Sequence, residues 1–167
     1  MTDEQTFFVD GYMHGTLPFN LDIDRFDKYN FIDCTQPENL WVDPSAKKDL
    51  NTIHKWLADH YVSKLFDDFE MKECAMWSGV DHGSREWHND FEDANKFNSN
   101  ILIYMDDNTK RNGNNIQVKS HDYHFTLYPK RRDFVWLNQK KCFEHRAAHK
   151  TGNRRVLSFE YLVPALI

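Results

Sequence analysis

From residue 71 onward, the chain consists of short segments rich in β-branched and aromatic residues, separated by clusters of Gly, Asn, Asp and Pro. Segments of this length and composition are typical of strands joined by turns. Many evenly spaced strands favour an antiparallel sandwich or jelly roll. We predict strands at 72–77, 85–90, 99–105, 115–119, 124–127, 133–137, 141–147 and 154–162.

One long amphipathic helix is predicted ahead of these strands, over about residues 44–69. Asp43-Pro44 offers a capping side chain followed by proline at the first helical position, where proline is well tolerated. Apolar residues at three- and four-residue spacing then form one stripe, which we interpret as core. The stripe consists of Leu50, Ile53, Trp56, Leu57, Tyr61 and Leu65. Residues 1–42, aromatic-rich and broken by Gly and Pro, are predicted to form short strands and loops.

Length and composition limit the functional classes. The 167 residues amount to about one domain, and an aromatic content of 15% argues against disorder. A net charge of −5 argues against non-specific nucleic-acid binding. No apolar run is long enough for a membrane span, and the start of the sequence lacks the features of a signal peptide. The three cysteines form no Cys-x-x-Cys pair, so we expect a single reduced, cytoplasmic domain over residues 1–167.

The first motif with chemical content is His88-Asn89-Asp90. Residues two apart on a strand face the same way, so His88 and Asp90 can converge on one point. A His-x-Asp pair alone has a high false-positive risk, because a chain rich in both residues contains such pairs by chance. Support must therefore come from elsewhere in the sequence.

That support comes from His145, followed nine positions later by Arg154. His149 competes with His145 for the same role, but the ninth residue after it is Ser158, which carries no charge. Two imidazoles and one carboxylate with open positions left over suit non-haem Fe(II) and its oxygen chemistry. A guanidinium group suits a bidentate grip on a carboxylate.

With these residues in this order, the sequence resembles the Fe(II)/2-oxoglutarate-dependent oxygenases, and within them the prolyl-4-hydroxylase-like branch. The resemblance covers about residues 70–163. It implies a mainly β fold with α structure: a double-stranded β-helix, or jelly roll, with the long helix packed on its larger sheet. The jelly-roll core would span residues 71–163, with residues 1–70 as helical and strand support.

The resemblance also implies roles for six residues. The metal ligands, and with them the catalytic centre, would be His88, Asp90 and His145. The residues that bind 2-oxoglutarate would be Arg154, Tyr104 and Ser158.

Arg155 is the alternative to Arg154 as the anchor for 2-oxoglutarate. Neighbouring residues of a strand face opposite sides, so the two arginines separate. Arg154 shares a polar face with Val156, Ser158 and Glu160, whereas Arg155 shares an apolar face with Leu157, Phe159 and Tyr161. The family implies that helices cover the outer face of the larger sheet. We therefore assign the polar face, with Arg154, to the cofactor pocket.

The implied activity is that of an Fe(II)/2-oxoglutarate-dependent dioxygenase. Its partners would be 2-oxoglutarate, dioxygen and a substrate that is a peptide, with proline as the first guess, or an amino acid, and it would release succinate and CO2. Two alternatives remain at this point. One is a non-catalytic jelly-roll module that binds a metal or a carboxylate. The other is a zinc-dependent hydrolase with the same three ligands, which leaves Arg154 and Tyr104 without a role.

Overall fold

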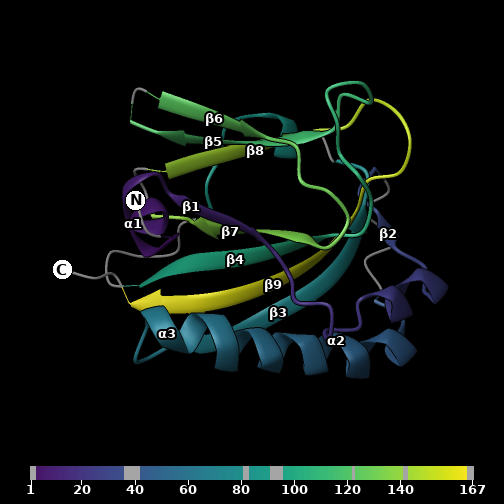
Figure 1. The fold of residues 1–167 in the computed structure, drawn as a ribbon, viewed down its shortest axis with the longest axis horizontal. Coiled ribbons are helices and arrows are strands. Elements are labelled where there is room, and N and C mark those ends of the chain that lie inside the picture. Colours follow the sequence, from purple (N-terminus) through teal and green to yellow (C-terminus); the bar gives the residue numbers. More distant parts are fainter. Residues whose placement is uncertain are drawn as a thin grey trace.

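The computed structural model describes residues 3–35, 42–80, 83–90, 96–121, 123–140 and 143–164. Two β-sheets face each other, and helices cover the outer face of the larger one (Figure 1). The larger sheet has the strand order β1-β7-β4-β9-β3-β2, and the smaller sheet has the order β6-β5-β8. The strands are β1 (Tyr12–Thr16), β2 (Ile32–Asp33), β3 (Glu70–Ser78), β4 (Lys96–Tyr104), β5 (Asn115–Ser120), β6 (Tyr123–Leu127), β7 (Asp133–Asn138), β8 (Phe143–Ala148) and β9 (Arg155–Pro164).

The long helix begins where the sequence predicts. α2 (Pro44–Leu57) is capped by Asp43, whose carboxylate accepts a hydrogen bond from the Ser45 backbone N–H at 2.9 Å. The helical path continues through one π-turn, η3 (Ala58–Val62), and ends with α3 (Ser63–Leu65). The helix therefore ends at residue 65, and the predicted end at 69 is wrong. The next residues include Asp67 and Asp68, whose negative charges are unfavourable at the negative end of a helix.

The main hydrophobic core lies between the larger sheet and these helices. Alternate residues of β9, including Leu157, Phe159 and Tyr161, are fully buried in it. Tyr161 also donates a hydrogen bond from its hydroxyl to the His54 carbonyl at 2.8 Å, which ties β9 to α2. A second, smaller cluster fills part of the space between the two sheets and includes Ile116 and Val156. The alternation predicted for residues 154–162 is thus present in β9.

The N-terminal region contains a helix that the sequence analysis did not predict, so the description of residues 1–42 as strands and loops is incomplete. α1 (Asp3–Val9) places Phe7 against Trp136, with ring centroids 4.7 Å apart. Asn138 donates from its side-chain amide to the Phe7 carbonyl at 3.1 Å, which satisfies one free carbonyl near the end of the helix. Seven residues span barely two turns, so no periodic apolar pattern was visible. A 3₁₀ turn, η1 (Asp24–Lys28), follows β1.

The segment predicted as a strand at 85–90 is not a regular strand. It begins in a 3₁₀ turn, η4 (Gly83–Arg85), and then meets β8 through an isolated bridge between His88 and His145. Beyond the bridge, side chains replace strand partners: the Asp90 N–H donates to Gln139 Oε1 at 2.8 Å, and the Asp90 carbonyl accepts from Asn98 Nδ2 at 2.9 Å. The side-chain amides of Gln139 and Asn98 thus form the hydrogen bonds that a strand partner would otherwise form with the Asp90 backbone. The segment can therefore leave the sheet after His88.

Among the described residues, no helix has the length and apolar character needed to cross a membrane.

Candidate metal centre and adjoining pocket

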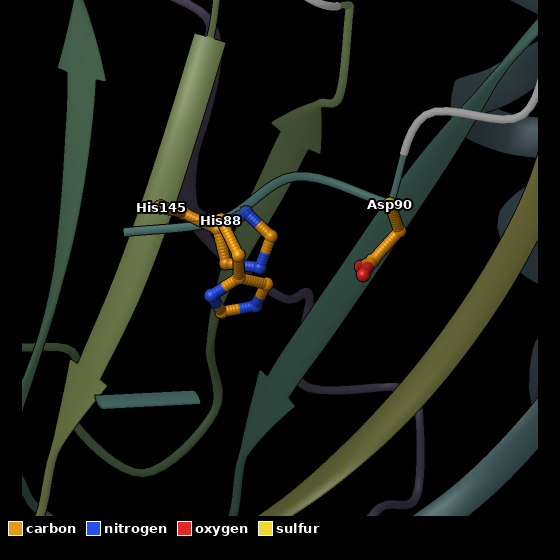
Figure 2. A group of neighbouring side chains, drawn as sticks. All are labelled: His88, Asp90 and His145. Carbon is orange, nitrogen blue, oxygen red and sulfur yellow. The ribbon is translucent and has the colours of Figure 1, made fainter. Parts of the chain in front are cut away.

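Three side chains from two separated segments meet between the sheets. His88 and His145 are held together by two backbone hydrogen bonds, His88 N–H to His145 O at 3.1 Å and His145 N–H to His88 O at 2.8 Å. Their rings lie side by side with centroids 4.2 Å apart, and Asp90 reaches in from the irregular segment that follows His88 (Figure 2). Each of the three residues offers one ligand atom, and these atoms all lie within 4.8 Å of one another. The structure thus brings the three predicted ligands into one group that can hold a metal ion.

The burial of His145 and the orientation of the His88 ring suit metal binding. Burial and the neighbouring His88 lower the pKa of His145 to about 3, so this ring is neutral near pH 7 and keeps a lone pair for a metal. The Nδ1 atom of His88 lies 2.8 Å from the Glu86 carbonyl oxygen. A carbonyl can only accept, so Nδ1 carries the hydrogen and Nε2 is the free ligand atom.

Asp90 is positioned through its backbone. Gln139 and Asn98, which hold the Asp90 N–H and carbonyl, are both buried, and the Gln139 N–H in turn donates to the Asn98 carbonyl at 3.2 Å. The Asp90 side chain itself is exposed to the pocket. Neither amide was predicted from the sequence, because nothing in the local pattern around Asn98 or Gln139 marks its side chain as a contact of the Asp90 backbone.

A pocket of about 220 Å³ adjoins the three ligands. Arg154, only 7% exposed, lies in its wall and donates from one terminal nitrogen to the Gly79 carbonyl at 3.0 Å. Its Nε atom has no hydrogen-bond partner among the described residues. A buried donor without a partner is costly, so this side of the guanidinium is suited to an acceptor on a bound ligand.

Tyr104 lies beneath Arg154, with the guanidinium carbon 5.7 Å from the centre of its ring. The tyrosine is fully buried, and its hydroxyl likewise has no hydrogen-bond partner in the described part of the chain. Burial raises the pKa of Tyr104, so the hydroxyl keeps its proton and acts as a donor. Two unsatisfied buried donors beside a possible metal site fit a ligand that carries an anionic group, such as a dicarboxylic acid.

The third predicted cofactor residue, Ser158, lines the same pocket but already has a partner. Its hydroxyl donates to Asn100 Oδ1 at 3.1 Å. Asn100 and Glu160 also line the pocket, and the sequence analysis assigned neither of them a role. Side-chain alternation alone predicts Glu160, which shares the inward face of β9 with Ser158. Asn100 then follows from the pairing of β4 with β9, in which it lies opposite Glu160.

The two alternatives weighed in the sequence lie elsewhere. Arg155 turns to the opposite side of β9, where it forms ion pairs with Asp106 at 2.7 Å and Asp27 at 3.0 Å. His149 lies outside the three-residue group, with its Nε2 atom 2.8 Å from the Gly152 carbonyl oxygen. The face assignment made from side-chain alternation therefore agrees with the geometry.

Comparison with known proteins gives results for structure but not for sequence. No protein-family model and no curated protein matches the chain. Among solved structures, a viral collagen prolyl hydroxylase from Paramecium bursaria Chlorella virus-1, in complex with 2-oxoglutarate, is similar at a TM-score of 0.62 and 12% identity, over 95% of this chain and 99% of that one. A prolyl hydroxylase from Trichoplax adhaerens, bound to a peptide fragment of hypoxia-inducible factor, is similar at a TM-score of 0.65 and 10% identity, over 96% and 87%.

A third similar structure is HygX from Streptomyces hygroscopicus, which has nickel and 2-oxoglutarate bound. It aligns at a TM-score of 0.58 and 14% identity, over 100% of this chain and 88% of that one. The chain has the fold of these oxygenases. The predicted jelly roll, mainly β with a helix on its larger sheet, is confirmed.

Proposed function

We propose that this protein is an Fe(II)- and 2-oxoglutarate-dependent dioxygenase that hydroxylates a peptide or amino-acid substrate. The observation that carries the proposal is the meeting of His88, Asp90 and His145 in the pocket that also holds the unsatisfied guanidinium of Arg154. Two imidazoles and one carboxylate leave open positions on an octahedral ion, as oxygenase chemistry requires.

Arg154 distinguishes this function from a zinc-dependent hydrolase. A hydrolase needs three ligands and a bound water, and this ligand set by itself gives no role to a buried cation with a free donor in the same pocket. A dicarboxylate that chelates the metal at one end presents its second carboxylate to such a cation. Arg154 would bind that group and Tyr104 would donate to it, since both have unsatisfied donors. Ser158 would line the site from β9, four residues after Arg154.

The protein's own contribution is to bind, orient and exclude water. Bound Fe(II) would activate dioxygen, which is the oxidant, and 2-oxoglutarate would be the electron-donating cosubstrate that leaves as succinate and CO2. His145 presents a neutral ring nitrogen, the Glu86 carbonyl orients the His88 ring through Nδ1, and Gln139 and Asn98 fix the backbone of Asp90. The buried Arg154 would neutralise the far carboxylate and so fix the direction from which the cosubstrate reaches the metal.

The substrate class follows from the structural neighbours rather than from the pocket. One similar structure is a collagen prolyl hydroxylase and another holds a peptide fragment, so a peptide is the substrate we propose first, with proline as the residue to test.

The test is anaerobic titration of Fe(II)-loaded protein with 2-oxoglutarate. We expect a visible charge-transfer band when the dicarboxylate chelates the metal. His145→Ala should abolish the band, because it removes a ligand. His149→Ala is the matched control, since His149 lies nearby but outside the group, and it should leave the band unchanged.

A wild-type protein that holds Fe(II) but shows no band would overturn the proposal. Succinate formation after air is admitted then separates an enzyme from a module that only binds. A band without succinate, even in the presence of proline-containing peptides, would favour the non-catalytic alternative.

A further inference from the structure

A second hollow, of about 360 Å³, lies on the smaller sheet, next to the metal pocket. Its walls carry the positively charged side chains of Arg85, Arg146 and Lys150, and also His149. None of the described residues that line it bears a carboxylate. We refer to it as the basic groove.

In the basic groove the Arg146 guanidinium is held in place, and the stem of Lys150 is partly restrained. Arg146 donates from Nε to Gln117 Oε1, and its guanidinium carbon lies 4.4 Å from the centre of the Trp87 ring. The aliphatic stem of Lys150 packs against Gly113, where an added Cβ would come within 2.5 Å of the lysine Cδ. Side chains fixed in this way lose little conformational entropy when they bind a ligand.

The cations of the basic groove are not paired with carboxylates in the described part of the chain. In the described part of the chain, Arg85, Arg146 and Lys150 form no ion pair, whereas Lys119 on the same sheet is paired with Glu144 at 3.0 Å. The whole chain carries a net charge of −5, so this concentration of cations runs against the average. A local field of this sign favours an anionic partner.

The basic groove begins where the metal pocket ends. Ala147 lines both hollows, and the adjacent residues Ser84 and Arg85 line the pocket and the groove, respectively. Along β8, the metal ligand His145 faces the pocket and the next residue, Arg146, faces the groove. An extended chain whose reacting residue enters the pocket would therefore pass over this rim, with its next residues above the cations, since it advances about 3.3 Å per residue.

The geometry points to the basic groove as a docking site for acidic side chains that flank the reacting residue of a peptide or protein substrate. This inference rests on the proposed function for the word substrate, but not for the binding itself. A peptide fits better than a nucleic acid. The cations form a short cluster rather than a stripe along a backbone, and Arg146 already covers one face of the Trp87 ring.

The binding test uses fluorescence anisotropy with a fluorescein-labelled oligoglutamate peptide and the full chain, at low and at physiological salt. The groove variant is Arg85→Glu with Lys150→Glu. The matched control is Lys47→Glu with Lys48→Glu, which reverses two exposed lysines on α2 and changes the net charge equally. We expect the groove variant to weaken binding about tenfold or more, and the control to weaken it less than about twofold.

The inference is overturned if wild-type protein does not bind the peptide, or if both variants lose affinity equally. It is also overturned if an oligothymidylate binds more tightly than oligoglutamate and depends on the same two residues. No metal or turnover enters this measurement. A protein that binds oligoglutamate but shows no charge-transfer band would therefore refute the proposed function and leave the groove as an acidic-peptide site.

The position beside the pocket is tested with Mn(II) loaded at the three ligands. Paramagnetic broadening of the peptide's proton signals should be graded along its length, strongest at the end that reaches the rim. Bound peptide with no broadening at either end contradicts docking beside the metal pocket. The Arg85→Glu, Lys150→Glu variant should show no gradient at the same peptide concentration.

Discussion

The two faces of β9 show how differently one strand can be used. On the face toward α2, the apolar side chains are fully buried, and Arg155 beyond them is paired with Asp106 and Asp27. On the face toward the smaller sheet, Arg154 is also buried but keeps an unsatisfied Nε, and the hydroxyl of Tyr104 below it is unsatisfied too. Buried polar groups are rarely left without partners. On the face toward α2, Arg155 has its partners within the chain. On the face toward the smaller sheet, Arg154 and Tyr104 would find the missing partners only on a bound ligand.

The largest effect on stability is expected from the face toward α2. Phe159 is fully buried against His54, and Phe159→Ala should lower the free energy of unfolding by about 3–5 kcal/mol through lost burial and a residual cavity. Urea unfolding measures this change. The milder Phe159→Leu should stay folded and keep its affinity for 2-oxoglutarate. If it loses that affinity while folded, the two faces are not independent.

Arg154→Leu should have the opposite effect: a large loss of affinity for 2-oxoglutarate and only a small loss of stability. The affinity of the Fe(II)-loaded protein for 2-oxoglutarate should fall by roughly 2–5 kcal/mol, about 30-fold to a few thousand-fold, because a buried carboxylate loses its charged partner. The free energy of unfolding should change by only about 1 kcal/mol, since the guanidinium makes one hydrogen bond, to Gly79, within the described chain. Calorimetric titration and urea unfolding measure the two quantities.

Arg155→Leu is the matched control for this prediction. It breaks the ion pairs with Asp106 and Asp27 and should lower stability, while leaving the affinity for 2-oxoglutarate nearly unchanged. Equal losses of affinity in the two leucine variants would show that the assignment of faces, and with it the role of Arg154, is wrong.

The assignment of faces is the part of the site that the sequence predicts best, and for a physical reason. Side chains alternate along a strand, so the contrast between Arg154 and Arg155 is a local property of residues 154–162. The start of α2 is local in the same sense, because Asp43 and Pro44 act on their own neighbours. Features of this kind need no knowledge of the rest of the fold.

The proximity of His88 and Asp90 was predicted from a strand at 85–90, but the structure has no regular strand there. Asp90 reaches the histidines because Gln139 and Asn98 hold its backbone after the isolated bridge at His88. Gln139 is 49 residues from Asp90, and although Asn98 is only eight residues away, the side-chain amides of Asn98 and Gln139 carry no local mark of the backbone group that they bind. α1 escaped prediction for a related reason, since its stability depends on packing of Phe7 against Trp136.

Gln139 is therefore a positioning residue, and its removal should have a moderate effect. Gln139→Ala leaves the Asp90 N–H without its acceptor, and the affinity for Fe(II) or Mn(II) should fall about 10- to 100-fold. Asn138→Ala is the control, because Asn138 is buried equally but holds the Phe7 carbonyl on the far side. Both variants should lose stability, and only Gln139→Ala should lose metal affinity. If Gln139→Ala and Asn138→Ala lose metal affinity to a similar extent, Gln139 has only a structural role.

The smallest predicted effect is a pH dependence of stability that comes from His54. The partner of His54 is Glu160, which has contacts on both faces of β9. The carbonyl of Glu160 accepts a hydrogen bond from His54 Nε2 at 3.0 Å, on the side toward α2, while Glu160 also lines the pocket. Burial lowers the pKa of His54 below its usual value of 6.5, so the unfolded chain binds a proton at this residue more readily than the folded one.

The stabilising contribution of neutral His54 is thus fully present above pH 6.5 and is lost as the pH falls below that value toward the lower folded-state pKa. One such group adds at most about 1.4 kcal/mol per pH unit to the slope of stability against pH. His54→Gln retains a donor for the Glu160 carbonyl but does not titrate. Urea unfolding between neutral and mildly acidic pH should therefore show a shallower slope for this variant than for the wild type. An unchanged slope would assign the acid sensitivity to other groups, foremost His145, whose pKa of about 3 has the same sign of effect.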